Sequence, residues 1–233
     1  IFRLKTVTYG LKPSAQLAIR TLTELADQDG HLYRDEVANA LKNNFYVDDY
    51  LQSFQDVETA KSVSEQLSQL LKKGGFFLRS WCSNNKKFIK TKNQDEIDLS
   101  PIEIFKEDTT VKTLGMHWCP LTDSFTYKIK FKTECKYTKR TILSEIASIF
   151  DPLNYLSPVI ITAKIFMQKL WELKTDWDKE VPTDLKEQWI KYRNSLVDLE
   201  KISIPRKLCP GKTIQTPELH IFCDASEMGN GCS

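Results

Sequence analysis

Two adjacent carboxylates, Asp48 and Asp49, stand between residues that favour β-strands, in the segment Phe45-Tyr46-Val47-Asp48-Asp49-Tyr50-Leu51. Aromatic and β-branched residues on both sides of a polar pair are typical of two strands joined by a tight turn. We therefore expect a β-hairpin that carries both acids at its tip. The segment contains no lysine or arginine, so the two carboxylates would repel each other unless a cation sat between them.

This pair of acids predicts a metal site. Magnesium prefers oxygen ligands and is commonly bound through one or two carboxylates together with phosphate oxygens. Two Mg²⁺ ions held by aspartates can activate an attacking hydroxyl and stabilise a leaving phosphate oxygen, as in polymerases and nucleases. We therefore predict that Asp48 and Asp49 are catalytic metal ligands. The alternative is an ordinary surface turn, where such pairs are also found.

Further motifs occur in a fixed order around this segment. They are Thr6-Val7-Thr8-Tyr9-Gly10-Leu11-Lys12-Pro13-Ser14, then Leu114-Gly115-Met116-His117-Trp118, then Thr138-Lys139-Arg140-Thr141-Ile142-Leu143 with Ile149-Phe150-Asp151-Pro152-Leu153, and Leu219-His220-Ile221-Phe222-Cys223-Asp224-Ala225-Ser226. Together with Tyr46-Val47-Asp48-Asp49, this order resembles the reverse transcriptases of long-terminal-repeat retrotransposons, most closely the reverse transcriptase and RNase H region of BEL/Pao polyproteins.

The resemblance implies an RNA-directed DNA polymerase with two Mg²⁺ ions, in which Asp48 is the main metal ligand and Asp49 the weaker one. The implied partners are an RNA or DNA template with a DNA primer, deoxynucleotide triphosphates and the rest of the polyprotein, without a membrane. The implied location is intracellular: cytoplasmic virus-like particles and, as a second compartment, the nucleus. Further implied roles are nucleotide or template binding by Tyr9, Gly10, Pro13, Tyr46 and Val47, primer binding by Gly115, Met116, His117 and Trp118, and metal binding by Asp224.

Basic residues are clustered although the net charge is only +2. One run without acidic residues extends from Lys72 to Lys92, and a second extends from Lys128 to Arg140 with only Glu134 against it. Lysines that alternate with apolar residues place one basic face on a strand. Such a face can contact phosphates or simply protect a sheet edge from aggregation. We predict backbone contacts to nucleic acid by Lys72, Lys73, Lys86, Lys87, Lys128 and Lys130.

The chain is expected to have an α+β fold, with a palm-like antiparallel sheet and helices, a helical thumb, and the start of an RNase H-like domain. Caps and apolar periodicity predict helices over 14–29, 34–42, 57–73, 138–150, 158–173 and 182–199, with Asp56 as a cap and Gly30 as a left-handed stop. Trp171, Trp177 and Trp189 are expected to pack between helices. The expected parts are a palm with the catalytic hairpin (1–92), a polar loop or insert (93–110), a primer-grip-like hairpin (111–133), a helical thumb or connection (134–203), a linker (204–217) and the start of an RNase H-like domain (218–233).

Composition excludes several other classes. With 41% hydrophobic and 27% charged residues, the chain is globular. Its six cysteines have no paired spacing, which argues against structural zinc and a disulfide framework. The longest apolar run is too short for a membrane span.

The ends of the chain give a further expectation. The resemblance implies another catalytic aspartate before Thr6 and more RNase H carboxylates after Asp224, so we expect a fragment with little or no activity by itself. A degraded or co-opted nucleic-acid-binding module without catalysis is the alternative. An aspartic peptidase region of a Pao polyprotein is less favoured, because Asp224-Ala225-Ser226 lacks the Asp-Thr/Ser-Gly pattern.

Overall fold

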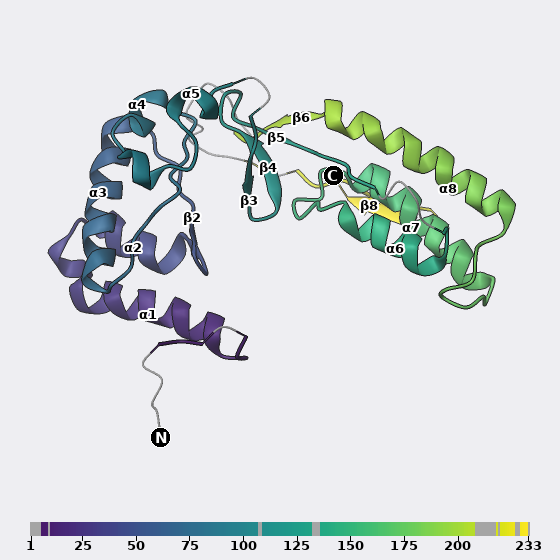
Figure 1. Cartoon of the computed structure of the whole chain (residues 1–233), viewed down its shortest axis with the longest axis horizontal. Helices are drawn as coiled ribbons and strands as arrows, with labels where there is room; N and C mark the ends of the chain where they lie inside the picture. The colour runs from purple at the N-terminus through teal and green to yellow at the C-terminus, as the bar shows by residue number, and fades with distance from the viewer. Residues whose placement is uncertain are drawn as a thin grey trace. The chain divides into compact units, whose positions relative to one another are not determined.

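The computed structural model describes residues 6–8, 10–106, 109–131, 136–207, 218, 220–226 and 229–232. The chain divides into two compact units, Ile1–Thr109 and Thr110–Ser233 (Figure 1). Each unit combines helices with short antiparallel strands, which confirms the expected α+β class. The two units are described separately.

The first half of unit 1 consists of three helices and one hairpin. The helices are α1 (Ser14–Asp29), α2 (Asp35–Asn43) and α3 (Val57–Lys73), and the hairpin joins β1 (Phe45–Tyr46) to β2 (Asp49–Tyr50). All three helices lie where the sequence predicts them. Their apolar faces form one core of Leu22, Ala26, Val37, Ala40, Leu41, Val63, Leu67, Leu70 and Leu71.

Helix α3 begins as the sequence predicts. The carboxylate of Asp56 accepts hydrogen bonds from the backbone N–H of Thr59 at 2.7 Å and from its hydroxyl at 2.8 Å. These bonds lower the pKa of Asp56, because they favour the ionised carboxylate. The cap fixes the direction in which the chain leaves the hairpin and enters α3.

The expected left-handed stop at Gly30 is wrong. Gly30 has φ −60° and opens a 3₁₀ helix, η1 (Gly30–Leu32). A side chain would nevertheless be excluded there, because a Cβ atom on Gly30 would lie 2.8 Å from the Cβ of Ala38. The glycine is explained by the close approach of α2, not by a left-handed backbone conformation.

Residues 93–110, expected as a polar loop, contain regular structure. The short helices here are η2 (Gln94–Glu96) and α5 (Pro101–Ile104), and they follow another short helix, α4 (Lys86–Ile89). Two capping boxes begin these helices, one formed by Asn93 with Glu96 and the other by Ser100 with Glu103. In each, the two residues are three positions apart, a signal that is hard to recognise in a polar segment. Phe88, Ile89 and Ile104 bury a second small core beneath these helices.

Unit 2 contains a four-stranded antiparallel sheet in the order β3 (Val111–Thr113), β4 (Met116–Cys119), β5 (Ser124–Thr126) and β6 (Ser203–Pro205). The hairpin expected within 111–133 is formed by β4 and β5, and β3 pairs with the other edge of β4. Strand β5 is short and ends at Thr126, before the predicted basic residues Lys128 and Lys130. Strand β6 pairs Phe125 with Ile204 from far along the chain, at the start of the segment expected to be a linker.

The helical part of unit 2 consists of α6 (Lys139–Ser148), α7 (Ser157–Glu172), α8 (Thr183–Ser195) and the 3₁₀ helix η3 (Leu196–Lys201). All three α-helices were predicted. Two more strands, β7 (Cys223–Ser226) and β8 (Gly229–Cys232), form a separate antiparallel pair at 223–232. Within the described ranges, no helix is long and apolar enough to span a membrane.

The tryptophans of these helices do not all pack as expected. Trp189 is fully buried against Phe166, with ring centroids 5.3 Å apart. Trp171 and Trp177, by contrast, are 57% and 37% exposed and contact each other edge to face at 5.4 Å. Trp177 lines a surface hollow of about 410 Å³ together with Arg140, Leu143, Ser144 and Ala147. The packing prediction is confirmed for Trp189 and wrong for Trp171.

A buried ion pair joins α6 to α8. Glu145 is 8% exposed, accepts a hydrogen bond from the indole N–H of Trp189 at 2.8 Å, and lies 3.0 Å from Nε of Arg193. The guanidinium of Arg193 also lies 4.7 Å from the ring centroid of Phe131. Breaking a buried pair by removing one partner strands the other charge in a poorly solvated site.

We predict that Glu145→Ala lowers the free energy of unfolding of unit 2 by about 3–5 kcal/mol, because it leaves the Arg193 charge and the Trp189 N–H without their acceptor. Urea denaturation monitored by tryptophan fluorescence measures this loss. Glu172→Ala, at the exposed end of α7, is the matched control and should change it little. A loss below about 1 kcal/mol in Glu145→Ala would contradict the role assigned to the pair.

Candidate metal and nucleic-acid sites

The hairpin of β1 and β2 forms where the sequence predicts it, but its turn lies one residue earlier than expected, because Asp49 belongs to β2. Phe45 pairs with Tyr50 and Tyr46 pairs with Asp49, which leaves Val47 and Asp48 as the two turn residues. Directly opposed residues share a face of the ribbon. The rings of Phe45 and Tyr50 are 5.3 Å apart and pack against the core of unit 1, so Tyr46 and Asp49 lie on the other, exposed face.

The turn at Val47 has an unfavourable backbone conformation. Val47 has φ 58°, in the left-handed region, whereas Asp48 is not among the residues with positive φ. A positive φ at only the first turn residue is the pattern of a type II′ turn, which normally has glycine there. A β-branched residue in this region is an outlier, and such outliers cluster at functional sites.

Among the residues that the structure describes, no lysine or arginine forms an ion pair with Asp48 or Asp49. Asp48 and Asp49 are exposed, and within the described residues neither side chain makes a hydrogen bond or an ion pair. Two free, water-accessible carboxylates are a suitable donor set for Mg²⁺, which keeps several waters and takes further oxygens from a phosphate. The described part of the chain contains no group of three or more His, Cys, Asp or Glu residues that could hold a metal ion.

The motif at 6–14 forms the entry to α1. The hydroxyl of Ser14 donates a hydrogen bond to the carbonyl of Thr8 at 2.5 Å, and Pro13 is the residue before the first turn of the helix. Gly10 has φ +80° with open space around it, so backbone conformation explains the glycine there. Tyr9 lies outside the described residues, and the nucleotide-binding roles of Tyr9, Gly10 and Pro13 stay predictions.

The predicted primer-binding residues Gly115, Met116, His117 and Trp118 lie in unit 2. Leu114 and Gly115 are the turn residues between β3 and β4, with φ 48° and 85°, the pattern of a type I′ turn. Gly115 also permits a close contact, because a Cβ atom there would lie 2.6 Å from the ring of Phe150. Two of the motifs seen in the sequence, Leu114-Gly115-Met116-His117-Trp118 and Ile149-Phe150-Asp151-Pro152-Leu153, are thus in contact.

Trp118 is held in a network that the sequence did not reveal. Its indole N–H donates to Oδ1 of Asp123 at 3.0 Å, and the guanidinium of Arg206 donates to both oxygens of Asp123 at 2.7 and 2.9 Å. Arg206 follows β6 directly. The pairing of β5 with β6 therefore fixes both the β4–β5 turn and the orientation of Trp118.

A cationic face lies on this sheet. Lys112, His117 and Thr126 are cross-strand neighbours, which places them on the same face. Burial lowers the pKa of His117, and the positive charges of Lys128, Lys112 and Lys130 lower it further. Burial is the larger cause, and the three lysines add to it because like charges disfavour protonation. Lys112 is the member that sequence reading missed, although its alternation with Val111 and Thr113 could have signalled it.

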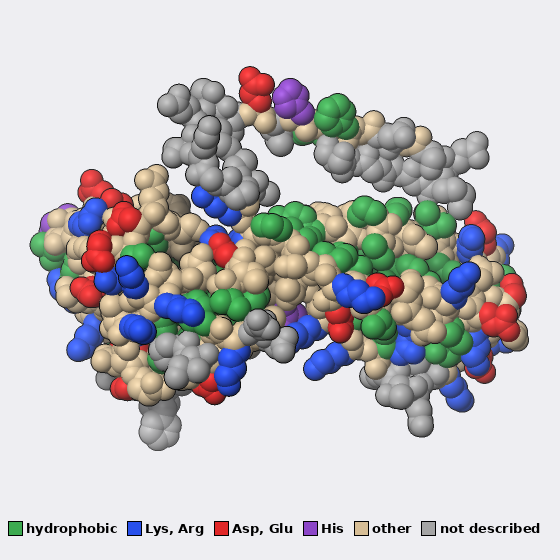
Figure 2. Space-filling view, turned by 90° about the horizontal axis from the view of Figure 1, so that it is seen from above, with side chains coloured by type: hydrophobic (Ala, Val, Ile, Leu, Met, Phe, Trp, Pro, Cys, Tyr) green, Lys and Arg blue, Asp and Glu red, His purple; other side chains and the backbone are tan. Residues whose placement is uncertain are grey.

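The remaining predicted lysines lie in unit 1. Lys72 and Lys73 occupy the last turn of α3, and Lys86 and Lys87 form the first turn of α4. Two of them contact aromatic rings: Nζ of Lys73 is 5.4 Å from the centroid of Tyr33 and Nζ of Lys86 is 5.0 Å from that of Phe105. In the view of Figure 2, basic and acidic side chains are interspersed on both units. On this face, positive charge is therefore confined to small groups of side chains.

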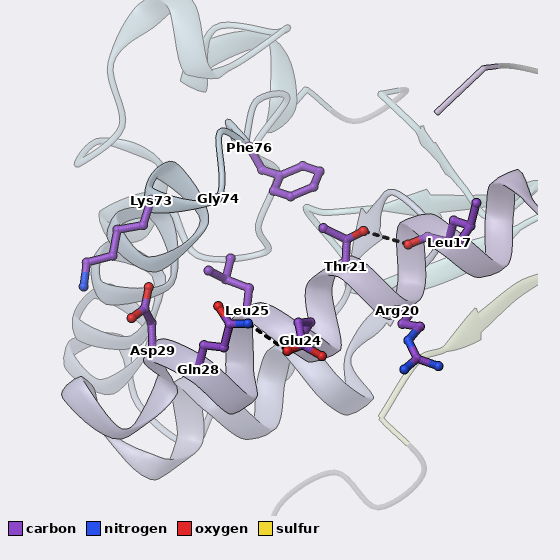
Figure 3. A pocket seen from close by; sticks show the side chains of 10 residues that line it. All are labelled: Leu17, Arg20, Thr21, Glu24, Leu25, Gln28, Asp29, Lys73, Gly74 and Phe76. Atoms are coloured by element: carbon purple, nitrogen blue, oxygen red, sulfur yellow. Dashed lines mark hydrogen bonds between the residues drawn. The ribbon is translucent and has the colours of Figure 1, made fainter. Parts of the chain in front are cut away.

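One hollow of unit 1 is lined by no residue of the hairpin. It measures about 460 Å³ and lies between α1 and the end of α3, where Leu17, Leu25 and Phe76 form its apolar part (Figure 3). Arg20 and Lys73 bring positive charge to it, and Glu24 and Asp29 bring negative charge. The mixed charges favour no particular ligand.

The predicted site residues therefore form two separate groups. Asp48, Asp49, Tyr46, Val47, Gly10 and Pro13 belong to unit 1, and Gly115, Met116, His117, Trp118, Lys128 and Lys130 belong to unit 2. Asp224 lies in β7 opposite Gly231. Its role as a metal ligand stays a prediction.

Comparison with protein families gives one match. Residues 138–233 match the model of the Pao retrotransposon-like RNaseH-like domain, which supports a Pao retrotransposon polyprotein region. The match begins at Thr138, the cap of α6, and so includes the helices expected to form a thumb or connection. No curated protein and no solved structure matches the chain.

We predict that Val47→Gly raises the free energy of unfolding by about 1 kcal/mol, because glycine adopts φ 58° without the steric cost that valine pays. Urea denaturation detects the change. Val7→Gly, in the exposed segment before α1, is the control and should not stabilise the chain. A loss of about 1 kcal/mol or more in Val47→Gly would mean that packing of the valine outweighs its backbone strain.

Proposed function

We propose that this chain is a part of the RNA-directed DNA polymerase of a Pao-type retrotransposon, with the Asp48–Asp49 hairpin as its metal-binding element. The observation that carries this proposal is the hairpin itself: it has a strained turn at Val47 and presents two exposed carboxylates that have no neutralising side chain among the described residues. The family match of residues 138–233 supports the same polyprotein context independently of that hairpin.

Each residue of the hairpin has a distinct part in this proposal. Asp48 and Asp49 would hold Mg²⁺, and the bound ion would neutralise negative charge on a nucleotide's phosphates. Tyr46 shares the exposed face with Asp49 and would contact the primer terminus, while Phe45 and Tyr50 anchor the opposite face in the core. Positioning and charge neutralisation are the main contributions that such a site makes to phosphoryl transfer.

The sheet of unit 2 would hold a nucleic-acid strand. Lys112, Lys128 and Lys130 are exposed and surround His117, which gives the face an excess of positive charge that phosphates would relieve. Contacts of this kind do not depend on base sequence, as a polymerase that copies any template requires. Phosphate binding would also favour protonated His117, whose pKa is lowered in the free chain, so binding should strengthen as the pH falls through the ordinary histidine pKa and below it.

A nucleic-acid-binding module without catalysis is the second candidate. It is favoured by the absence of a cluster of three or more metal-ligating side chains within the described ranges. The cationic face of unit 2 would function in both candidates. The carboxylate pair would function only in the first.

We predict that Asp48→Asn lowers Mg²⁺-dependent primer extension by at least about 100-fold in a retrotransposon polyprotein that contains this chain, because it removes a metal ligand. Its thermal unfolding should stay unchanged, since the side chain is exposed and without a partner among the described residues. Asp95→Asn, an exposed acid in η2, is the matched control. Undiminished extension by Asp48→Asn would refute the polymerase assignment, and absent extension in every form would favour the second candidate.

We predict that Lys128→Gln with Lys130→Gln weakens binding to a primer–template hybrid and makes it less sensitive to salt. Each lost phosphate contact should reduce the slope of log K against log salt by about 0.9. Fluorescence anisotropy across a salt series measures this slope. Lys191→Gln, exposed in α8, should leave the slope unchanged. An unchanged slope in the double variant would exclude this face from nucleic-acid binding.

A further inference from the structure

A row of aromatic rings leads from the carboxylate hairpin into the second core of unit 1. Phe45 and Tyr50 lie 5.3 Å apart, Tyr50 and Trp81 6.1 Å, and Trp81 and Phe88 5.8 Å between ring centroids. The Tyr50 and Trp81 rings meet edge to face at 81°, a favourable aromatic geometry. The buried face of the hairpin therefore rests on Trp81.

A lysine cation lies at the far side of this row. Nζ of Lys92 is 4.1 Å from the ring centroid of Trp81 and 5.1 Å from that of Phe88, and it donates a hydrogen bond to the hydroxyl of Ser64 at 3.1 Å. Ser64 is buried in α3, at 1% exposure. Lys92 thus ties the indole of Trp81 to the main helix of the unit.

Among the described residues, no hydrogen bond orients the side chain of Trp81. Its indole N–H is buried and has no hydrogen-bond partner among the described residues. The ammonium of Lys92 over the ring is then the polar contact that fixes the plane of the indole. Burial lowers the pKa of Lys92, while the carboxylates of Glu96 and Glu65 oppose that shift and favour the charged form.

The hairpin needs external support. It has only two residue pairs, its turn is strained at Val47, and short isolated hairpins are marginal in water. Beyond its own pairing, the backbone N–H of Leu51 donates to the carbonyl of Asn44 at 2.9 Å, and the Tyr50 hydroxyl donates to Gln52 at 2.6 Å. Packing of Tyr50, together with that of Phe45, therefore links the carboxylates to the rest of the unit.

We propose that Lys92 and Trp81 are positioning residues of the carboxylate site: the Lys92 cation fixes the indole of Trp81, and the indole fixes Tyr50 and with it the geometry of Asp48 and Asp49. The inference rests on the proposed function of the hairpin. Neither residue touches the metal or a substrate. Their contribution is to hold the two carboxylates in one arrangement, which lowers the cost of closing them around a cation.

The test compares Lys92→Met, which keeps the length of the side chain without its charge, with Lys92→Arg, which keeps the cation. Lys90→Met, exposed at the end of α4, is the matched control. The first readout is hydrogen exchange of the Leu51 amide, with amides inside α3 as the internal reference. The second is Mn²⁺ affinity by electron paramagnetic resonance, with Asp48→Asn as the site control.

We expect Lys92→Met to accelerate exchange at Leu51 about tenfold and to weaken Mn²⁺ binding to a similar degree, while exchange inside α3 stays unchanged. Lys92→Arg should retain most of both properties, and Lys90→Met should match the unmodified chain. Trp81→Phe, which keeps a ring beside Tyr50, provides a second variant and should accelerate the same amide if Lys92→Met fails to fold.

Two results would overturn the inference. One is exchange at Leu51 that stays at the unmodified rate in Lys92→Met or, should that variant not fold, in Trp81→Phe. The other is faster exchange throughout α3 as well, which would make Lys92 a general stabilising residue. Failure of the proposed function has a different signature, because Mn²⁺ affinity would then be unaffected by Asp48→Asn while hydrogen exchange still decides whether Lys92 positions the hairpin.

Discussion

The arrangement of unit 1 depends on anchoring one face of a very short hairpin. Two negative charges repel at its tip, and a valine occupies a backbone conformation that normally requires glycine. Both effects destabilise the hairpin. Burial of Phe45 and Tyr50 against the helical core, and the contact of Tyr50 with Trp81, stabilise it. A metal ion would remove the repulsion, so binding of a cation and stability of the hairpin are expected to be coupled.

Local sequence signals predicted much of this fold. Capping residues and apolar periodicity located all six longer helices, because Asp56 and Thr138 satisfy helix N-termini through side-chain hydrogen bonds. The signals failed where long-range packing decides. Strand β6 pairs with β5 although many residues separate them in the sequence. Glycine is required at position 30 because Ala38 lies too close for a side chain. Residues 93–110 were misjudged, because polar composition concealed two capping boxes over buried Ile97 and Ile104.

The candidate sites were predicted to a similar extent. Pattern alone located the hairpin and the strand of His117, since both are local in sequence. It could not reveal that Lys112 joins Lys128 and Lys130 around His117, or that Arg206 holds Asp123 and Trp118, because these contacts arise from sheet pairing. The support of Tyr50 by Trp81 and Lys92 likewise requires tertiary structure.

The proposed chemistry of the hairpin requires that Asp48 and Asp49 together bind a divalent cation. The most direct measurement is X-ray diffraction from crystals of this chain grown with Mn²⁺, with data collected at the manganese absorption edge. The account predicts an anomalous difference peak within coordinating distance of both carboxylates, with water completing the coordination. Manganese peaks only elsewhere, with the two carboxylates turned apart into solvent, would contradict it.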